Sequence, residues 1–326
     1  MRRAALPLAA AVVAAGSWQA GRPPRGLMLT VLDVGQGDAI AVRVAGGGCT
    51  LVDAGPAADG RDAGRAIVLP ALARLGCRRL DRLVVTHAHV DHLGGLASVA
   101  RQVPVGEVWD AGHPEGGLPY RQALAAVLGG GIPLLVPVAG TARRDGAATW
   151  RVLGPARPLH RGTRSDANNN SVVLLLEYEG TRILLAGDLE DAGERRLLAE
   201  VPPGGLRADL LKVAHHGSRF GSSARFLAAV RPRASLVSVG RGNTFGHPDP
   251  GTMSRLAAWG PVYRTDRDGA LTVTVARATW SVVPWPAAAR LASPIRGRPD
   301  TSGGAGVSAG RHGGRPHSTR TRPKTA

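Results

Sequence analysis

Apolar residues in this chain fall mainly into short runs, many of them β-branched, that end at glycine, asparagine, aspartate or proline. Such runs are typical of strands that are buried in a sheet. The predicted strands cover residues 27–34, 38–45, 49–55, 82–86, 105–109, 132–136, 149–153, 171–178, 181–188, 208–214, 234–240, 262–264, 270–276 and 279–283. Helical spacing of apolar residues predicts helices at 60–75, 92–102, 190–200, 222–230 and 252–259. Strands in meanders, followed by strands alternating with helices, predict two packed sheets with helices outside.

The same pattern divides the chain into three segments. Residues 1–26 begin with two arginines and a short apolar stretch, the layout of a secretory signal or membrane anchor followed by a linker. The end of a longer membrane segment and an alanine-rich helix are the alternatives. Residues 27–286 form the predicted folded domain. Residues 287–326 are rich in Gly, Ser, Arg, Pro and Thr and are predicted to be a basic disordered tail.

Composition and charge narrow the class of protein. The 44% hydrophobic and 20% charged content of the 326 residues excludes wholesale disorder, collagen and a multi-span membrane protein. The net charge of +17 lies mostly at the ends: residues 290–326 contribute +7 and residues 1–26 contribute +4. Basic ends attract polyanions, whether nucleic acid or anionic lipid. With only Cys49 and Cys77 there is no four-cysteine zinc site. We expect two separate core cysteines rather than a disulfide.

Four potential metal ligands stand within six residues directly after an apolar strand: His87, His89, Asp91 and His92. Residues two apart in an extended segment point the same way, so His87 and His89 share one face. Asp91 also suits the N-cap of the following helix. Imidazole favours zinc and similar metals, whereas carboxylate adds tolerance for harder ions such as manganese. The motif therefore predicts a centre for one or two divalent metal ions, Zn²⁺ or Mn²⁺.

The motif and its successors resemble a known family. The further motifs are Leu32-Asp33-Val34-Gly35-Gln36-Gly37-Asp38-Ala39, Val52-Asp53-Ala54-Gly55, Leu185-Ala186-Gly187-Asp188-Leu189-Glu190, Leu211-Lys212-Val213-Ala214-His215-His216-Gly217-Ser218 and Gly246-His247-Pro248. Their types and order resemble the metallo-β-lactamase superfamily, and within it the hydrolase domain of the ComEC-type DNA internalization competence proteins. The resemblance implies an α+β fold, a four-layer αββα sandwich that holds metals between the ends of its sheets.

By this resemblance His87 and His89 bind the first metal, Asp91 and His92 bind the second, and Asp188 bridges the two. The expected catalytic residues are Asp91, Asp188 and a third, Lys212.

One of His215 and His216 completes the second metal, and strand alternation should let only one of them face it. Lys212 either stabilises a phosphate or the transition-state charge, or lies at a strand edge. Many superfamily members carry a further histidine where this chain has Asn170, a poor replacement ligand whose oxygen could hold a water or a hard ion.

Six further polar residues belong to these motifs. They are expected either to orient ligands or to meet the substrate: Asp33, Asp38, Asp53, Ser218, Asn243 and His247. For the three aspartates the alternative is a plain turn-forming role.

The resemblance implies a metal-dependent hydrolase in which a metal-held hydroxide attacks the substrate, with DNA as the expected substrate and a phosphodiesterase or nuclease activity. It also implies an extracytoplasmic location, membrane-associated or secreted, and a membrane channel protein of the competence apparatus as a partner. The alternatives are a small-molecule hydrolase acting on a lactone, lactam or phosphodiester, and a catalytically silent DNA-binding scaffold. The chain is either a stand-alone relative or the C-terminal part of a longer or split gene product.

Overall fold

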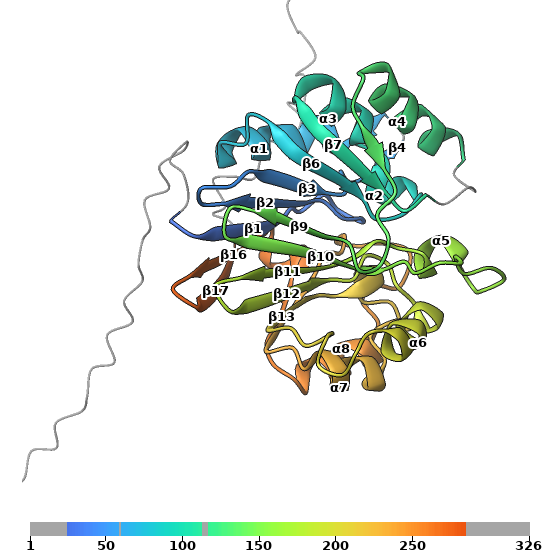
Figure 1. Ribbon diagram of the computed structural model, residues 1–326. Coiled ribbons are helices and arrows are strands. Elements are labelled where there is room, and N and C mark those ends of the chain that lie inside the picture. Colours follow the sequence, from blue (N-terminus) through green and yellow to red (C-terminus); the bar gives the residue numbers. More distant parts are fainter. Residues whose placement is uncertain (1–24, 59, 113–116, 285–326) are drawn as a thin grey trace, which may run out of the picture. The chain divides into compact units, whose positions relative to one another are not determined.

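The computed structural model describes residues 25–58, 60–112 and 117–284, which belong to one compact unit. The predicted signal-like segment and basic tail fall almost wholly outside these ranges. Figure 1 shows two stacked sheets between two layers of helices, as the sequence predicts. No helix among the described residues is both long and apolar enough to cross a bilayer.

The first sheet has the order β17-β16-β1-β2-β3-β6-β7-β8. Its strands are β1 (Leu27–Val31), β2 (Ile40–Val44), β3 (Cys49–Val52), β6 (Leu80–Val85), β7 (Val105–Asp110), β8 (Leu134–Leu135), β16 (Leu271–Ala276) and β17 (Thr279–Pro284). Pairing is antiparallel from β17 to β3 and parallel from β3 to β8. A separate two-stranded ribbon joins β4 (Ala57–Ala58) to β5 (Arg61–Asp62).

The second sheet has the order β15-β14-β13-β12-β11-β10-β9. Its strands are β9 (Ala142–Asp145), β10 (Ala148–Gly154), β11 (Val173–Tyr178), β12 (Thr181–Leu185), β13 (Leu210–Lys212), β14 (Ala234–Val237) and β15 (Val262–Arg264). Pairing is parallel from β15 to β12 and antiparallel from β12 to β9. Each sheet thus has a group of neighbouring parallel strands, whose carboxyl ends meet at one edge.

The helices cover the outer faces of both sheets. Those beside the first sheet are the π-helix η1 (Gly64–Val68), α1 (Leu69–Leu75), α2 (Val90–Leu93), α3 (Leu96–Gln102) and α4 (Leu118–Gly129). The later ones are α5 (Asp166–Asn169), α6 (Asp191–Glu200), the 3₁₀ turn η2 (Ala214–Gly217), α7 (Ala224–Val230), α8 (Pro250–Ala257) and α9 (Thr265–Asp268). Helix α4 and strand β9 were not predicted from the sequence, whereas α6 and α7 lie where they were expected.

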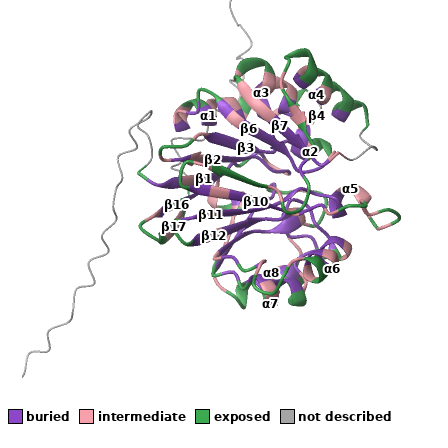
Figure 2. Ribbon diagram, viewed as in Figure 1, coloured by how far each residue is buried: buried purple, intermediate pink, exposed green. Residues whose placement is uncertain are grey.

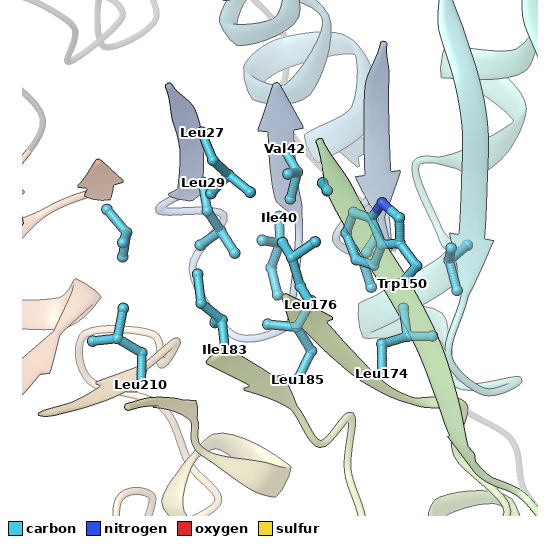
Figure 3. Close-up of a cluster of buried hydrophobic side chains, with 14 of the residues drawn as sticks. Leu27, Leu29, Ile40, Val42, Trp150, Leu174, Leu176, Ile183, Leu185 and Leu210 are labelled. Atoms are coloured by element: carbon cyan, nitrogen blue, oxygen red, sulfur yellow. The ribbon is translucent and has the colours of Figure 1, made fainter. Parts of the chain in front are cut away.

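Three buried apolar clusters bind the four layers together. The central one lies between the sheets, where Leu29 and Ile40 of the first sheet approach Leu176 and Ile183 of the second (Figure 3). Neighbouring residues of β11 alternate between this cluster and the one under the outer helices, since successive side chains of a strand point to opposite faces. Burial on both faces explains the continuous apolar runs, and Figure 2 shows the buried sheets between exposed helix surfaces.

The cysteines correct one expectation. Cys49 at the start of β3 and Cys77, three residues before β6, form a disulfide with a Cα–Cα distance of 5.8 Å. Residues 28 positions apart come together because β3 and β6 are parallel neighbours, which brings the turn after α1 to the beginning of β3. No local pattern around either cysteine indicates this neighbourhood, and the prediction of two separate cysteines was wrong.

Candidate metal centre

The predicted ligands come from loops at the carboxyl ends of strands in both sheets. Asp53 follows β3, and the histidine motif follows β6. Asp188 follows β12, and the His215-His216 pair follows β13. Gly95 permits this arrangement, because a Cβ atom there would lie 2.3 Å from the carbonyl oxygen of Ala54.

Four buried residues form the centre of the cluster. The ligand atoms of Asp38, His92, Asp188 and His216 all lie within 4.8 Å of one another. His92 Nε2 is 3.2 Å from Asp188 Oδ1, and His216 Nε2 is 3.5 Å from Asp188 Oδ2. Asp91, less buried, places Oδ2 3.3 Å from His216 Nε2. The residues predicted for the second metal therefore meet at one point, with Asp38 beside them.

The residues predicted for the first metal lie next to this point. His87 Nε2 is 3.1 Å from His89 Nδ1 and 3.8 Å from Asp188 Oδ2, so Asp188 faces both groups. His87 is fully buried, whereas His89 is exposed. His89, rather than Asp91, is the N-cap residue of α2, which begins at Val90. Asp91 lies in the first turn.

Hydrogen bonds fix which ring nitrogen of each buried histidine faces the centre. His92 Nδ1 donates to Asp53 Oδ2 at 2.7 Å, and His216 Nδ1 donates to the carbonyl oxygen of Ser238 at 3.0 Å. The Thr86 hydroxyl donates to Asp53 Oδ2 at 2.7 Å and so accepts from His87 Nδ1, 3.1 Å away. All three Nε2 atoms therefore present lone pairs to the centre, because each ring proton is already held on Nδ1.

This arrangement requires positive charge at its middle. The Nε2 lone pairs of His92 and His216 face each other 3.4 Å apart, beside the carboxylate of Asp188. Burial would lower the pKa of His216, but Asp188 and Asp38 raise it to about 10. In the same way Asp188 and Asp53 raise the pKa of His92 against the effect of burial. Two kinds of positive charge can meet this requirement: protons on the Nε2 atoms of His92 and His216, which their raised pKa values favour, or a divalent cation, which a nitrogen and oxygen donor set of this kind suits.

The histidine pair departs from the predicted strand geometry. His215 and His216 lie in the 3₁₀ turn η2 with positive φ angles of 48° and 54°, so the alternation rule does not apply to them. Both approach Asp188: His215 Nε2 is 3.9 Å from Oδ2, on the side of Glu190, whose Oε1 is 3.2 Å from His215 Nδ1. Unlike Asp53 with His92, Glu190 makes no hydrogen bond to His215; its Oε1 accepts from the Asn168 side-chain amide at 3.2 Å. Glu190 was not among the predicted site residues, although its position two residues after Asp188 could have indicated it.

Lys212 corrects another expectation. It ends β13, which lies between β12 and β14 and is not a sheet edge. Its side chain is fully buried, and Nζ donates to Asp38 Oδ2 at 2.6 Å and to the carbonyl oxygen of Val213 at 3.1 Å. A lysine engaged in this way does not contact a substrate. It positions Asp38, whose pKa the ammonium group of Lys212 lowers against the effect of burial.

Asn170 does not face the metal cluster. Its side-chain oxygen accepts from the backbone N–H of His160, and its amide group donates to the carbonyl oxygens of His160 and Asp166. Asn169 binds the same loop through Thr163 and the carbonyl oxygen of Ser165. The asparagines are therefore loop anchors, and Asn170 is not available to hold a water or an ion.

The remaining predicted residues build the loops around the centre. Asp33 is exposed and accepts from the backbone N–H of Gly35, a turn-forming contact. The Ser218 hydroxyl accepts from the N–H of Phe220. Asn243 accepts from the backbone N–H of His247 and donates to its carbonyl oxygen.

His247 itself lies above the histidine pair. Its ring is 5.1 Å from that of His215 and 6.1 Å from that of Phe245, which is 68% exposed. Burial and His215 lower the pKa of His247 to about 4, so this side chain is neutral at pH 7. His247 and Phe245 thus lie beside the histidine pair.

Comparison with known proteins identifies the family to which this chain belongs. A model of the metallo-beta-lactamase superfamily matches residues 32–241. Competence protein ComA of Neisseria gonorrhoeae is 33% identical over 260 residues, covering 78% of this chain and 33% of that protein. ComE operon protein 3 of Bacillus subtilis (strain 168) is 29% identical over 216 residues, covering 64% of this chain and 26% of that protein. The chain thus spans a third or less of the length of these relatives.

Among solved structures, Igni18, a metallo hydrolase from the archaeon Ignicoccus hospitalis, superposes with a TM-score of 0.50. It is 13% identical and covers 76% of this chain and 100% of its own length. This likeness supports the four-layer fold alone.

Proposed function

The chain belongs to the metallo-β-lactamase superfamily and is related to the ComEC-type competence proteins, and from this premise we propose that it is a nuclease that hydrolyses phosphodiester bonds of extracellular DNA. That it is a metal-dependent hydrolase follows from the family and from the buried cluster of histidines and aspartates. DNA as substrate is supported by the relatives, which are competence proteins, and by the basic ends of the sequence. The observation that carries the proposal is the set of Nε2 atoms directed at Asp188.

The chain's own residues have distinct tasks in this proposal. His92, Asp188, His216 and Asp91 would hold one divalent ion, and His87 and His89 would hold a second beside Asp188. When bound, such ions lower the pKa of a coordinated water from roughly 15.7 towards 7 and polarise a phosphoryl oxygen.

The residues behind these side chains fix their orientation. Asp53 orients His92 directly and His87 through Thr86. Lys212 holds Asp38 against the cluster. Preorganised groups of this kind lower the activation barrier because they do not have to reorient during the reaction.

A cleavage assay on the full chain tests the proposal. The purified protein is analysed for metal and incubated with linear double-stranded DNA and Mn²⁺ or Zn²⁺. We expect Asp188→Asn and His87→Ala to abolish cleavage and to leave DNA binding intact. Asp209→Asn is the matched control, because Asp209 directly precedes β13 at the end of the sheet opposite the centre.

Three outcomes contradict the proposal. Cleavage that persists in both variants refutes the site. Turnover of a generic phosphodiester or a lactone with intact DNA supports a small-molecule hydrolase. DNA binding by metal-free protein, without any hydrolysis when metal is added, supports a scaffold.

We also propose that the domain works outside the cytoplasm, membrane-associated or secreted, together with a membrane channel protein of the competence apparatus. The Cys49–Cys77 disulfide supports this location, because disulfides persist in oxidising compartments. Thiol labelling of the protein in intact cells tests it: labelling of both cysteines without prior reduction would contradict the proposed location. A reading frame for a channel-like membrane protein directly upstream would support the proposed partner.

A further inference from the structure

A basic hollow, lined in part by the residues that follow the His215-His216 pair in the chain, takes no part in the functions described so far. It has a volume of about 380 Å³, and its lining includes Arg164, Arg219, Phe220 and Arg255, with Asp191 as an acidic member. The carboxylate of Asp191 is occupied by Arg195, whose Nη1 is 2.7 Å away. The hollow therefore carries a surplus of positive charge.

Two of these arginines share one aromatic ring. The guanidinium carbon of Arg164 lies 3.7 Å from the ring centre of Phe220, and that of Arg219 lies 4.8 Å from it. Both arginine side chains are exposed. Within the described ranges, neither guanidinium has a carboxylate oxygen within 4.0 Å. Stacking on an aromatic face restricts a guanidinium while leaving its N–H groups free to donate.

The segments that bear these arginines are held firmly. Arg164 lies in the loop that Asn169 and Asn170 tie to helix α5. Phe220 is fixed through its own backbone: its N–H donates to the Ser218 hydroxyl, and its carbonyl oxygen accepts from the N–H of Asp191. The asparagine run thus holds the loop that carries Arg164 to this hollow.

The hollow is close to the proposed site of hydrolysis along the chain. Phe220 follows His216 by four residues, so its Cα lies at most about 15 Å away. Successive phosphates on one DNA strand are about 3.4 Å apart along the helix axis. A strand with one phosphodiester at the metal centre can therefore present another phosphate to the hollow.

We propose that Arg164 and Arg219, held on Phe220, form a phosphate-binding subsite for the backbone of the nucleic-acid strand that is cut at the metal centre. This inference rests on the proposed nuclease function and adds the position at which the strand is held. The contacts are to phosphate and carry no base specificity.

Binding is measured in chelator, so that it does not depend on cleavage. The full chain is titrated into fluorescein-labelled single-stranded DNA at several salt concentrations, and anisotropy gives the slope of log K against log salt. Each phosphate contact on single strands contributes about 0.7 to this slope. We expect Arg164→Gln/Arg219→Gln to bind more weakly and to reduce the slope by about 1.4.

Two further variants make the test specific. Arg78→Gln/Arg79→Gln removes two charges just before β6, at the end of that strand opposite His87, and should leave the slope unchanged. Phe220→Leu keeps both charges and should weaken binding at an unchanged slope, because the guanidinium groups lose their platform.

The outcomes separate this inference from the proposed function. An unchanged slope in Arg164→Gln/Arg219→Gln, or an equal loss in the control variant, overturns the subsite even if the chain cleaves DNA. A reduced slope in a chain that cleaves no DNA supports the subsite as a nucleic-acid contact and refutes the nuclease. An effect confined to binding of phosphatidylglycerol vesicles, with DNA binding intact, also overturns the subsite.

Discussion

Asp53 provides the sharpest test of how the metal centre is organised. Asp53 Oδ2 accepts from His92 Nδ1 and the Thr86 hydroxyl, both at 2.7 Å, and Oδ1 accepts from the Thr86 N–H at 2.8 Å. In Asp53→Asn an NH₂ group replaces Oδ2 and faces His92 Nδ1. The ring must then carry its proton on Nε2, the atom that faces the cluster. The Thr86 hydroxyl then no longer donates to Asp53 and donates to His87 Nδ1 instead. The proton of the His87 ring must therefore also move to Nε2.

The structure also sets the size of the effect. Loss of an outer partner that orients a metal ligand weakens metal binding by about 10- to 100-fold. Because two imidazoles change tautomer here, we expect the upper end of this range, a 100-fold weaker metal affinity or about 2.7 kcal/mol of binding free energy at 25 °C. The fold itself should survive: Asp53 has a positive φ of 59°, which asparagine tolerates, and burial already raises the pKa of its carboxyl group towards the neutral form.

Metal affinity is measured by competition with a chromophoric chelator, and thermal unfolding is followed with and without metal. Asp110→Asn is the matched control: Asp110 is also buried and accepts from a backbone N–H and a hydroxyl, those of Gly112 and Tyr120. It should lose stability but not metal affinity. Wild-type affinity in Asp53→Asn, or an equal loss in both variants, would refute the reasoning.

Four further predictions concern stability. Cys49→Ser/Cys77→Ser should lower the free energy of unfolding in urea by about 3.6 kcal/mol, the chain-entropy value for the 28-residue separation, and a loss below 1 kcal/mol would contradict it. Lys212→Met should cost about 3–5 kcal/mol, because its buried carboxylate partner loses its counter-charge; a near-neutral effect would argue against that ion pair. Burial and a hydrogen bond to a carboxylate raise the pKa of Tyr120, so its contribution to stability is complete below pH 10, the unfolded value, and is lost as the pH rises above it. Tyr120→Phe should therefore flatten the alkaline decline by up to about 1.4 kcal/mol per pH unit, and identical pH profiles would refute this. Removing bound metal with a chelator should lower the melting temperature, by the equivalent of about 2.7 kcal/mol for metal at 100 times its Kd, whereas an unchanged melting temperature would count against a metal that binds only the folded state.

Most of the strands, and the chemical types of the site residues, could be predicted from the amino-acid pattern alone. Strands buried on both faces need continuous apolar runs, and these can be located in a single sequence. The ligands of the metal centre directly follow strand ends, so the His87–His92 motif and Asp188 can be recognised from the local sequence. Helix α4 escaped prediction because its apolar residues do not mark a single face: Tyr120, Ala123 and Val127 are buried, whereas Leu118 and Leu128 are exposed.

Which of these residues contact one another depends on the packing of the whole fold. Lys212 and Asp38 are 174 residues apart, and nothing near either one indicates that the lysine is buried against that aspartate. Cys49 and Cys77 pair because β3 and β6 are neighbours, and His215 and His216 both reach Asp188 because a 3₁₀ turn replaces the expected strand. These contacts could not be predicted because the side-chain pattern encodes only which face of an element is buried, whereas contact partners depend on how the two sheets and their connecting loops pack.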